Sequence, residues 1–225
     1  MGMLTRTLTL LLSFAITWSS SSAWPQVAGT ANEGYKTKEG RERAARGLAG
    51  PMRDANQTPE AVVTALELKP GMTVADIGTG IGYMVPYLSR GVGPGGKVLA
   101  EDIQADFLDQ VRAKIAADGL ANVSVILGSE TDPQLPPDTV DVAFILDAYH
   151  HFDYPEKMLA CIRTSLKAQG RLVIAEYYQN QVPAGHIRLD GAGVTREVEA
   201  NGFRLISKND HLTNQQYMLI FSKRE

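Results

Sequence analysis

Three glycines and two carboxylates stand at the ends of two consecutive apolar segments of this chain. In the stretch V-A-D-I-G-T-G-I-G-Y, Asp76 stands at the end of the apolar run, and Gly78, Gly80 and Gly82 follow it. Asp102 ends the next apolar segment, about 20 residues after the last glycine. Glycine lets a backbone adopt positive φ and lets a ligand come close. A carboxylate at the position of Asp102 can accept hydrogen bonds from both hydroxyls of a ribose.

The glycine spacing also excludes some ligands. The chain contains no G-x-x-x-x-G-K-[S/T] loop, and the third glycine comes one residue too early for the dinucleotide pattern G-x-G-x-x-G. We therefore expect a ligand with a ribose but without a pyrophosphate. Two structural alternatives remain open at this point: Asp76 can brace the loop, and Asp102 can cap the following helix. A nucleotide-binding oxidoreductase of related fold also remains as an alternative.

Histidines mark a second candidate site, in the stretch D-A-Y-H-H-F (147–152). His150 or His151 is a candidate general base, because the ordinary pKa of histidine lies near neutrality. As neighbours on a strand they are expected to point in different directions, and the alternative is that one braces the loop while the other lies near solvent. No metal site is expected, because adjacent histidines lack the i, i+4 spacing and no other ligand cluster is evident. Tyr149 is expected either to line an acceptor pocket or to belong to the core. His186 is expected either to lie in a loop that covers the acceptor or to lie on the surface.

The elements that position these residues alternate regularly from Gly71 onward. Strands alternating with helices predict parallel βαβ units with helices on both faces of one sheet. The last two strands are expected to be antiparallel, because only a short turn joins them. Predicted strands are 72–77, 97–103, 123–127, 140–149, 171–178, 203–210 and 215–224, and predicted helices are 38–50, 57–71 with Thr58 as the cap, 83–92, 105–119, 155–170 and 193–202.

The N-terminal residues 1–23 are typical of an export signal. Arg6 precedes the apolar stretch Leu8–Trp18, and Ser21-Ser22-Ala23 predicts cleavage after Ala23. We expect an exported, periplasmic protein; the alternative is an uncleaved segment that tethers the chain to a membrane. Residues 24–37 are expected to be a flexible lead-in, and 38–225 a single domain with N-terminal helices over 38–68.

Composition narrows the possible partners. The 225 residues are 44% hydrophobic and 21% charged, and the formal net charge is −3. Because no cluster of Lys and Arg stands out, a nucleic-acid surface is not expected. The single Cys161 excludes a disulfide within the chain and a cysteine zinc cluster. The oligomeric state is not predicted.

Five stretches taken in order, VADIGTGIGY, VLAEDI, ILGSETDPQLP, VDVAFILDAYHHF and LKAQGRLVIAEY, resemble the successive motifs of class I S-adenosylmethionine-dependent methyltransferases. The resemblance runs from about Gly71 to Phe221. It implies an α/β, Rossmann-like, doubly wound sheet of seven strands in the order 3-2-1-4-5-7-6, with an antiparallel C-terminal strand. It also implies S-adenosylmethionine as cofactor and methyl transfer to an unidentified, small-molecule acceptor. A non-catalytic relative that only binds the cofactor is the alternative. No N-P-P-Y motif for nitrogen acceptors is present.

The resemblance further implies a role for each motif residue. The loop Gly78, Thr79, Gly80 and Gly82 shapes the floor under the methionine part of the cofactor. Asp76 orients that loop and the amino-acid end of the cofactor, Asp102 holds the ribose hydroxyls, and Ile103 packs on adenine. Ser129 and Glu130 meet the adenine edge, and Asp147 lies where cofactor and acceptor meet. The family often has aspartate where this chain has Ser129, which leaves Glu130 or the backbone for that contact. Arg53 and Asp54 close the cofactor pocket from the N-terminal side or form a surface ion pair.

Overall fold

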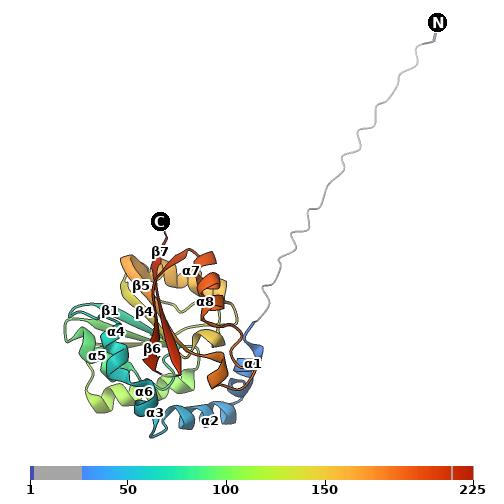
Figure 1. Ribbon diagram of the computed structural model, residues 1–225. Coiled ribbons are helices and arrows are strands. Elements are labelled where there is room, and N and C mark those ends of the chain that lie inside the picture. Colours follow the sequence, from blue (N-terminus) through green and yellow to red (C-terminus); the bar gives the residue numbers. More distant parts are fainter. Residues whose placement is uncertain (3–26, 214, 225) are drawn as a thin grey trace.

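The fold is a single sheet covered by helices on both faces (Figure 1). The computed structural model describes residues 1–2, 27–213 and 215–224; for residues 210–213 it describes the backbone only. The predicted signal and its cleavage site after Ala23 lie outside the described residues. Among the described residues, none of the helices combines the length and apolar character needed to cross a membrane.

Seven strands form the sheet in the order β3-β2-β1-β4-β5-β7-β6, which confirms the predicted topology. Pairing is parallel from β3 to β5 and antiparallel on both sides of β7. The reversal of order beside β1 places the carboxyl ends of β1 and β4 at a crevice where such sheets bind ligands. The strands are β1 (Thr73–Ile77), β2 (Lys97–Asp102), β3 (Val123–Leu127), β4 (Val140–Leu146), β5 (Leu166–Tyr177), β6 (Phe203–Thr213) and β7 (Gln216–Lys223).

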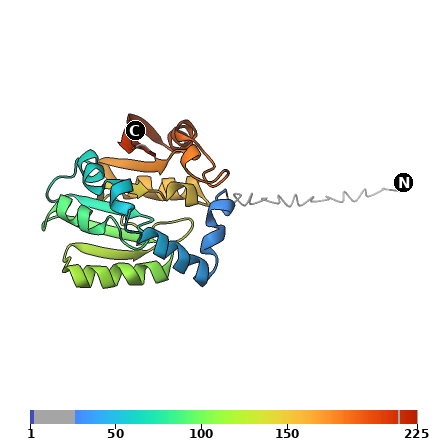
Figure 2. The same ribbon diagram turned by 60° about the horizontal axis from the view of Figure 1, so that its bottom comes forward.

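The helices cover the two faces because alternate strand residues point to opposite sides. On β1, Val74 packs in the cluster of α4 and α5, whereas Ala75 packs in the cluster of α7 and α8. Figure 2 shows the same strands and helices from a second direction. The helices are α1 (Gly29–Asn32), α2 (Lys38–Leu48), α3 (Arg53–Gln57), α4 (Pro59–Ala65), α5 (Val85–Val92), α6 (Ala105–Asp118), α7 (Pro155–Ser165) and α8 (Gly191–Ala200), with 3₁₀ turns η1 (Glu33–Tyr35), η2 (Tyr149–His151) and η3 (Gln179–Gln181).

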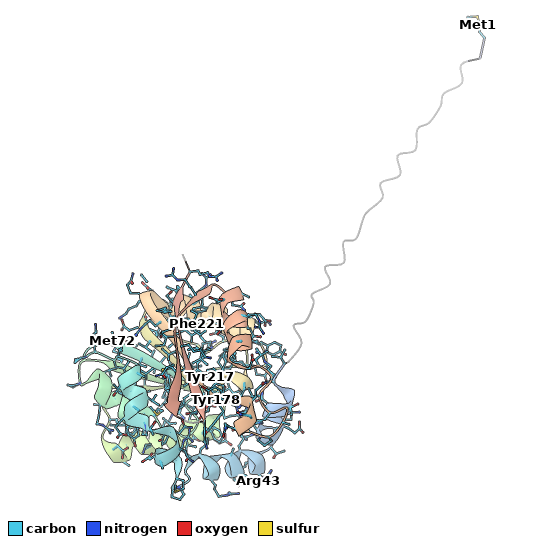
Figure 3. The ribbon with its side chains drawn as sticks, in the orientation of Figure 1. Met1, Arg43, Met72, Tyr178, Tyr217 and Phe221 are labelled. Atoms are coloured by element: carbon cyan, nitrogen blue, oxygen red, sulfur yellow. The ribbon has the colours of Figure 1, made fainter. Side chains whose placement is uncertain are left out.

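The antiparallel strand β7 contributes large side chains to the core. Tyr217 and Phe221 are fully buried, and Figure 3 shows both on β7 inside the body of the protein, whereas Arg43 lies at its rim. The ring of Tyr178 packs against that of Tyr217 with 5.5 Å between the centroids. Because truncating a buried Phe costs about 3–5 kcal/mol, Phe221 fixes this strand firmly against β5.

Three local expectations differ from the structure. Thr58 adopts a left-handed conformation (φ 44°), so its side chain does not cap α4, and its buried hydroxyl has no hydrogen-bond partner among the described residues. Helix α7 ends at Ser165 and β5 begins at Leu166, five residues earlier than predicted. The lead-in predicted over 24–37 is helical from Gly29 to Tyr35. There it packs onto the domain, where Asn32 Nδ2 donates to the carbonyl of His151 at 3.0 Å.

Candidate active site

A cavity of about 400 Å³ opens at the carboxyl ends of the central strands. Its floor comes from the loops after β1, β2, β3 and β4, and the N-terminal helices supply its opposite wall. Ligand pockets of an open α/β sheet lie at this edge. The cavity is lined by eight of the predicted cofactor residues, Gly78, Thr79, Gly80, Asp102, Ile103, Ser129, Glu130 and Asp147, and by one of the predicted catalytic residues, His151.

The glycine loop is built from backbone conformations that other residues rarely adopt. Gly78, Gly80 and Gly82 all have positive φ, at 71°, 58° and 79°. A Cβ on Gly78 would lie 2.6 Å from Cβ of Ala148, so the loop can pass this close to the end of β4 only without a side chain. Gly82 does not line the cavity and instead sits against Val111 of α6. The glycines therefore let the backbone of the loop lie close to the end of β4, at the floor of the cavity.

Two aspartates support this loop from below. Asp76 accepts a hydrogen bond from the hydroxyl of Thr79 at 2.6 Å and does not line the cavity, which is the bracing alternative. Asp102 accepts from the backbone N–H of Gly80 and of Gln104, each at 2.8 Å, and does line it. Burial, partly opposed by these hydrogen bonds, raises the pKa of Asp76 and of Asp102 to about 6. Asp102 thus combines loop support with an oxygen-rich face on the cavity.

Glu101 is a cavity residue that the sequence reasoning missed. It immediately precedes Asp102, is 1% exposed, and accepts from the backbone N–H of Gly78 at 3.3 Å. Its Oε1 has no hydrogen-bond partner among the described residues. Burial, followed by the charge of Asp102, raises the pKa of Glu101 well above its ordinary value. The signal was present, because the strand ends in two consecutive acids.

The third strand contributes a tight turn to the cavity wall. Ser129 Oγ accepts from the backbone N–H of Asp132 at 3.1 Å, and the backbone N–H of Ser129 donates to the carbonyl of Asp132 at 2.8 Å. Glu130 lies at the tip of this turn, beside the cavity. Ile103 and Phe107 supply the apolar surface next to it. This end of the cavity therefore combines flat apolar area with a polar edge, as an adenine ring requires.

The N-terminal helices close the cavity with residues that were largely missed. Tyr35 and Arg41 line it, and Arg41 forms an ion pair with Asp106 of α6 at 2.7 Å. Arg53 also lines it; its guanidinium lies 4.3 Å from the ring centroid of Tyr83 and donates to the carbonyl of Leu48 at 2.9 Å.

Asp54 accepts a hydrogen bond from the Tyr83 hydroxyl at 2.8 Å and does not line the cavity. Of the two residues expected to close the pocket from this side, Arg53 is therefore the one that faces it.

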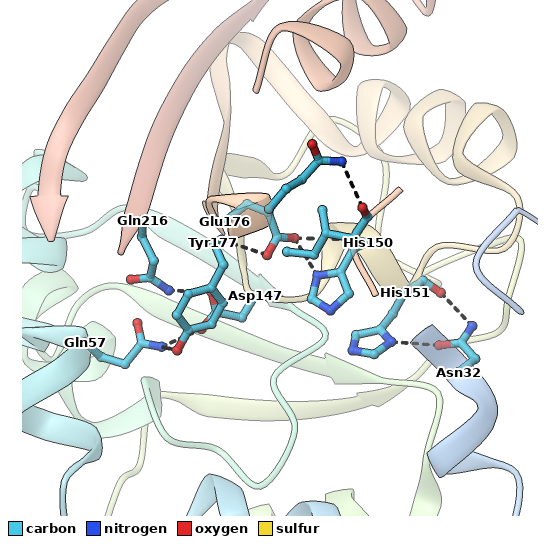
Figure 4. A network of polar contacts seen from close by, with 10 residues as sticks. Asn32, Gln57, Asp147, His150, His151, Glu176, Tyr177 and Gln216 are labelled. Atoms are coloured by element: carbon cyan, nitrogen blue, oxygen red, sulfur yellow. Dashed lines mark hydrogen bonds and ion pairs between the residues drawn. The ribbon is translucent and has the colours of Figure 1, made fainter. Parts of the chain in front are cut away.

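Asp147 occupies a strained position at the end of β4. Its φ is 52°, and its carboxylate accepts hydrogen bonds from the side-chain amides of Gln57 and Gln216 (Figure 4). Gln57 also donates to the hydroxyl of Tyr177 at 3.1 Å. Burial, and then the negative charge of Glu176, raises the pKa of Asp147 to about 7. Strained residues that the surroundings hold in this way cluster at active sites.

The two adjacent histidines lie in the 3₁₀ turn η2, beyond the end of the strand. Their ring centroids are 4.1 Å apart, so the expectation that they point in different directions is wrong; a 3₁₀ turn does not alternate its side chains as a strand does. His150 Nδ1 lies 2.7 Å from Glu176 Oε2, and His151 Nδ1 lies 2.8 Å from Asn32 Oδ1. Tyr149 is buried and donates to Glu197 at 2.6 Å, which places it in the core.

The two rings differ in their electrostatics. Burial alone would lower the pKa of His150, but the charge of Glu176 and its hydrogen bond outweigh burial and raise the pKa above its ordinary value. Burial, followed by the charges of His150 and His186, lowers the pKa of His151 to about 2. His151 is therefore neutral at physiological pH.

His186 reaches the same place from a distant loop. Its ring centroid lies 4.9 Å from that of His150, and its backbone N–H closes a turn on the carbonyl of Pro183. Gly185 in this turn has φ 79°. The spacing of the adjacent pair alone predicts no metal site, whereas potential ligand atoms of all three histidines lie within 4.8 Å of one another.

Comparisons with known proteins agree with this geometry. A family model described as "Methyltransferase domain" matches residues 75–174. A crystal structure of a SAM dependent methyltransferase from Aquifex aeolicus is 30% identical, covers 80% of this chain and 96% of that chain, and superposes with a TM-score of 0.75.

Two curated relatives match over shorter segments. Nocamycin O-methyltransferase from Saccharothrix syringae is 38% identical over 74 residues, which cover 33% of this chain and 26% of that protein. The ubiquinone/menaquinone biosynthesis C-methyltransferase UbiE from Vibrio campbellii is 31% identical over 110 residues, which cover 48% of this chain and 42% of that protein. The matches thus span less than half the length of these curated relatives. With the sheet order and the glycine cradle, these findings show that the chain belongs to the class I S-adenosylmethionine-dependent methyltransferases.

Proposed function

We propose that this protein transfers a methyl group from S-adenosylmethionine to a small-molecule acceptor by in-line displacement. The observation that carries the proposal is the cavity, in which the positive-φ glycine loop, Asp102 and Asp147 meet on one floor. When bound, the cofactor supplies the electrophilic methyl group and the leaving group. The protein has to bind it, align the acceptor and exclude water.

The residues present fit the cofactor. A Cβ would fill the cradle at Gly78, the partly apolar wall at Ile103 and Phe107 suits an adenine ring, and Asp102 offers carboxylate oxygens to a ribose. We assign the ribose hydroxyls to Asp102 and the adenine edge to the turn at Ser129 and Glu130. Asp76 acts by holding Thr79 and the loop, since it does not line the cavity.

Arg53 is proposed to bind the carboxylate of the cofactor's amino-acid end. Its guanidinium faces the cavity beside the glycine loop, held by the Tyr83 ring and the carbonyl of Leu48. Its Nε is buried and has no hydrogen-bond partner among the described residues. A guanidinium with unused donors is suited to a carboxylate ligand.

The acceptor is proposed to bind at the histidine end of the cavity. His151 lines this end, and His150 and His186 lie behind it. An acceptor oxygen, sulfur or nitrogen that carries a proton has to lose it during methyl transfer. We infer that His150 and His151 serve this loss of a proton, through ring nitrogens that their partners Glu176 and Asn32 hold in place.

The curated relatives support a small molecule as acceptor, because one is named a nocamycin O-methyltransferase and the other a C-methyltransferase of ubiquinone/menaquinone biosynthesis. The formal charge of −3 and the lack of a Lys/Arg cluster agree with this. We also propose that the protein is exported to the periplasm after cleavage behind Ala23, on the basis of Arg6 and the apolar stretch Leu8–Trp18.

One experiment tests the proposed reaction. The purified protein is incubated with methyl-labelled S-adenosylmethionine and a low-molecular-weight cell extract, and the labelled product is identified by mass spectrometry. Calorimetric titrations with S-adenosylhomocysteine and with NADH run in parallel. We expect binding of the first ligand, no binding of the second, and label in a small molecule. Binding without label on any acceptor would instead favour a non-catalytic relative.

A further inference from the structure

Histidines 150, 151 and 186 form a cluster whose chemistry the methyl-transfer fold does not require. Their potential ligand atoms lie within 4.8 Å of one another, and their ring centroids are 4.1, 4.9 and 5.9 Å apart. Two come from the turn η2 and one from the loop after η3, so the chain brings them together only on folding. Three imidazoles that converge at this range can ligate one metal ion.

The orientation of the His151 ring is fixed by Asn32. The amide nitrogen of Asn32 donates to Asp153 Oδ2 and to the carbonyl of His151, both at 3.0 Å. Its Oδ1, which can only accept, therefore faces His151 Nδ1 at 2.8 Å. The ring must carry its proton on Nδ1, and the lone pair consequently lies on Nε2.

Glu176 fixes the His150 ring in the same way. The carboxylate accepts from the backbone N–H of Tyr177 at 3.0 Å and of His150 at 3.3 Å, and its Oε2 lies 2.7 Å from His150 Nδ1. Both rings therefore turn Nε2 away from their partners, and Figure 4 shows these two nitrogens on facing sides of the rings. A histidine whose other nitrogen binds a carboxylate or an amide oxygen is the usual arrangement around protein-bound metals.

We propose that His150, His151 and His186 bind one divalent first-row transition-metal ion, with zinc as the reference ion. Three imidazole nitrogens suit such an ion and leave a coordination position for a further ligand. Two nitrogens on one tetrahedral zinc ion lie about 3.4 Å apart, so the longest separation in the cluster, up to 4.8 Å, has to contract by roughly 1.4 Å. The turn at Gly185 is exposed and can supply this movement to His186.

The surrounding charges favour a cation at this position. Glu176 contacts His150 directly, and Asp147 lies close enough to interact with it electrostatically. Lys36, Arg41 and Arg53 also line the cavity, from its N-terminal wall, and Lys36 follows Tyr35, whose ring centroid lies 4.9 Å from that of His151. Histidine ligates a metal through an unprotonated nitrogen, so a proton held on any of the three ligand nitrogens is released to the buffer when the ion binds.

The site also indicates an acceptor class, an inference that rests on the proposed function. Because His151 lines the cavity, the remaining coordination position is directed to the acceptor end. With the ion bound, His150 and His151 act as its ligands and not as bases, and a hydroxyl or thiol bound there loses its proton to water more readily, because the ion stabilises the anion. The anion then forms the new bond to the methyl carbon as the sulfur–methyl bond of the cofactor breaks, and nothing is oxidised or reduced. We therefore infer an oxygen or sulfur acceptor.

Metal titration of the full chain tests the site. Protein stripped with a chelator is titrated with zinc chloride by calorimetry, in two buffers of different ionisation enthalpy so that released protons are counted. We expect one zinc ion per chain. His186→Ala should weaken binding at least tenfold, and Asn32→Ala about 10–100-fold, because the His151 ring loses its fixed orientation. Asn32→Asp should not restore the affinity, because its carboxylate cannot donate to the His151 carbonyl and stands against the carboxylate of Asp153.

Controls separate this site from adventitious binding and from misfolding. His211→Ala removes the fourth histidine of the sequence and should leave zinc affinity unchanged. Each variant is titrated with S-adenosylhomocysteine, whose binding should persist. X-ray absorption of the zinc-loaded protein should show three imidazoles at about 2.0–2.1 Å.

The proposal is overturned if protein that binds S-adenosylhomocysteine takes up no stoichiometric zinc, or if His211→Ala weakens binding as much as His186→Ala. Zinc binding without S-adenosylhomocysteine binding would instead contradict the proposed function.

Discussion

The backbone N–H of Gly80 donates to the carboxylate of Asp102 across 2.8 Å, so the loop after β1 and the acid at the end of β2 form one unit. Replacing Asp102 by Ala should therefore weaken S-adenosylhomocysteine binding twice over, through the lost ribose contact and through a less ordered loop. Loss of a charge-assisted hydrogen bond costs about 1.5–3 kcal/mol, or roughly 10–150-fold in affinity. Calorimetry measures this loss, and unchanged affinity would contradict the ribose assignment.

The pKa of Asp102 predicts how the cofactor-free protein responds to pH. Burial raises this pKa from 3.8 to about 6, so the folded state holds a proton that the unfolded chain releases. The stability contributed by Asp102 is thus fully present below the unfolded pKa and is lost as pH rises through about 6.

The asparagine of Asp102→Asn does not titrate, so the variant does not lose this stability as the pH rises. Relative to wild type, the variant should gain on the order of 2–3 kcal/mol in free energy of unfolding between acidic and mildly alkaline pH. Urea unfolding at several pH values checks this, and a constant difference between the two proteins would rule it out.

Arg53 should distinguish ligands by their carboxylate. Arg53→Met keeps much of the side chain's apolar length against Tyr83 but removes the charge. Affinity for S-adenosylhomocysteine should fall about 10–100-fold, because a charge-assisted pair is lost. Affinity for 5′-methylthioadenosine, which lacks the amino-acid end, should barely change. Equal losses for both ligands would show that Arg53 acts through the loop and not through the carboxylate.

The histidines should affect turnover more than cofactor binding. Once an acceptor is known, His150→Ala and His151→Ala should each lower turnover by about 10²–10⁴, while S-adenosylhomocysteine affinity stays near wild type. The loss should shrink for an acceptor that is already ionised. Tyr149→Phe, in the same turn but in the core, is the matched control. If both histidine variants keep near-normal rates, positioning in the cavity is sufficient for transfer.

The N-terminus gives a prediction that is independent of catalysis. Cleavage after Ala23 makes Trp24 the first residue and removes Arg6, the only charged side chain before it, so the formal net charge changes from −3 to −4. N-terminal sequencing of protein from the cell envelope and from the cytoplasm decides this. Intact Met1 on the cytoplasmic protein alone would reject export.

The sheet could be predicted from the sequence because its signal is periodic and local. Apolar runs alternate with helical stretches, and the glycines after β1 mark where the chain must turn tightly. The predicted cofactor residues Asp102, Ile103 and Asp147 line the cavity because strand ends in a parallel sheet meet at one edge.

Other parts of the site depend on contacts between distant residues, which carry no local signal. His186 joins His150 only through the turn at Gly185, and Asn32 reaches His151 from a segment that reads as a polar lead-in. Threonine is a preferred N-cap residue, but Thr58 adopts the αL conformation at the junction of α3 and α4, and its side chain makes no capping hydrogen bond. Glu101 was overlooked because Asp102 beside it already satisfied the expected pattern.

Asn32 couples two events, the attachment of helix α1 to the domain and the orientation of the His151 ring, because one side chain takes part in both. The same side chain joins α1 to Asp153 and presents its oxygen to His151 Nδ1. By thermodynamic reciprocity, a ligand that prefers the oriented ring must also hold α1 in place, and by the same factor. Occupation of the histidine end should therefore slow hydrogen exchange at the backbone amide of Asn32, which donates to the carbonyl of Ala28. Conversely, a partner that pulls residues 27–35 off the domain would loosen whatever the histidines bind.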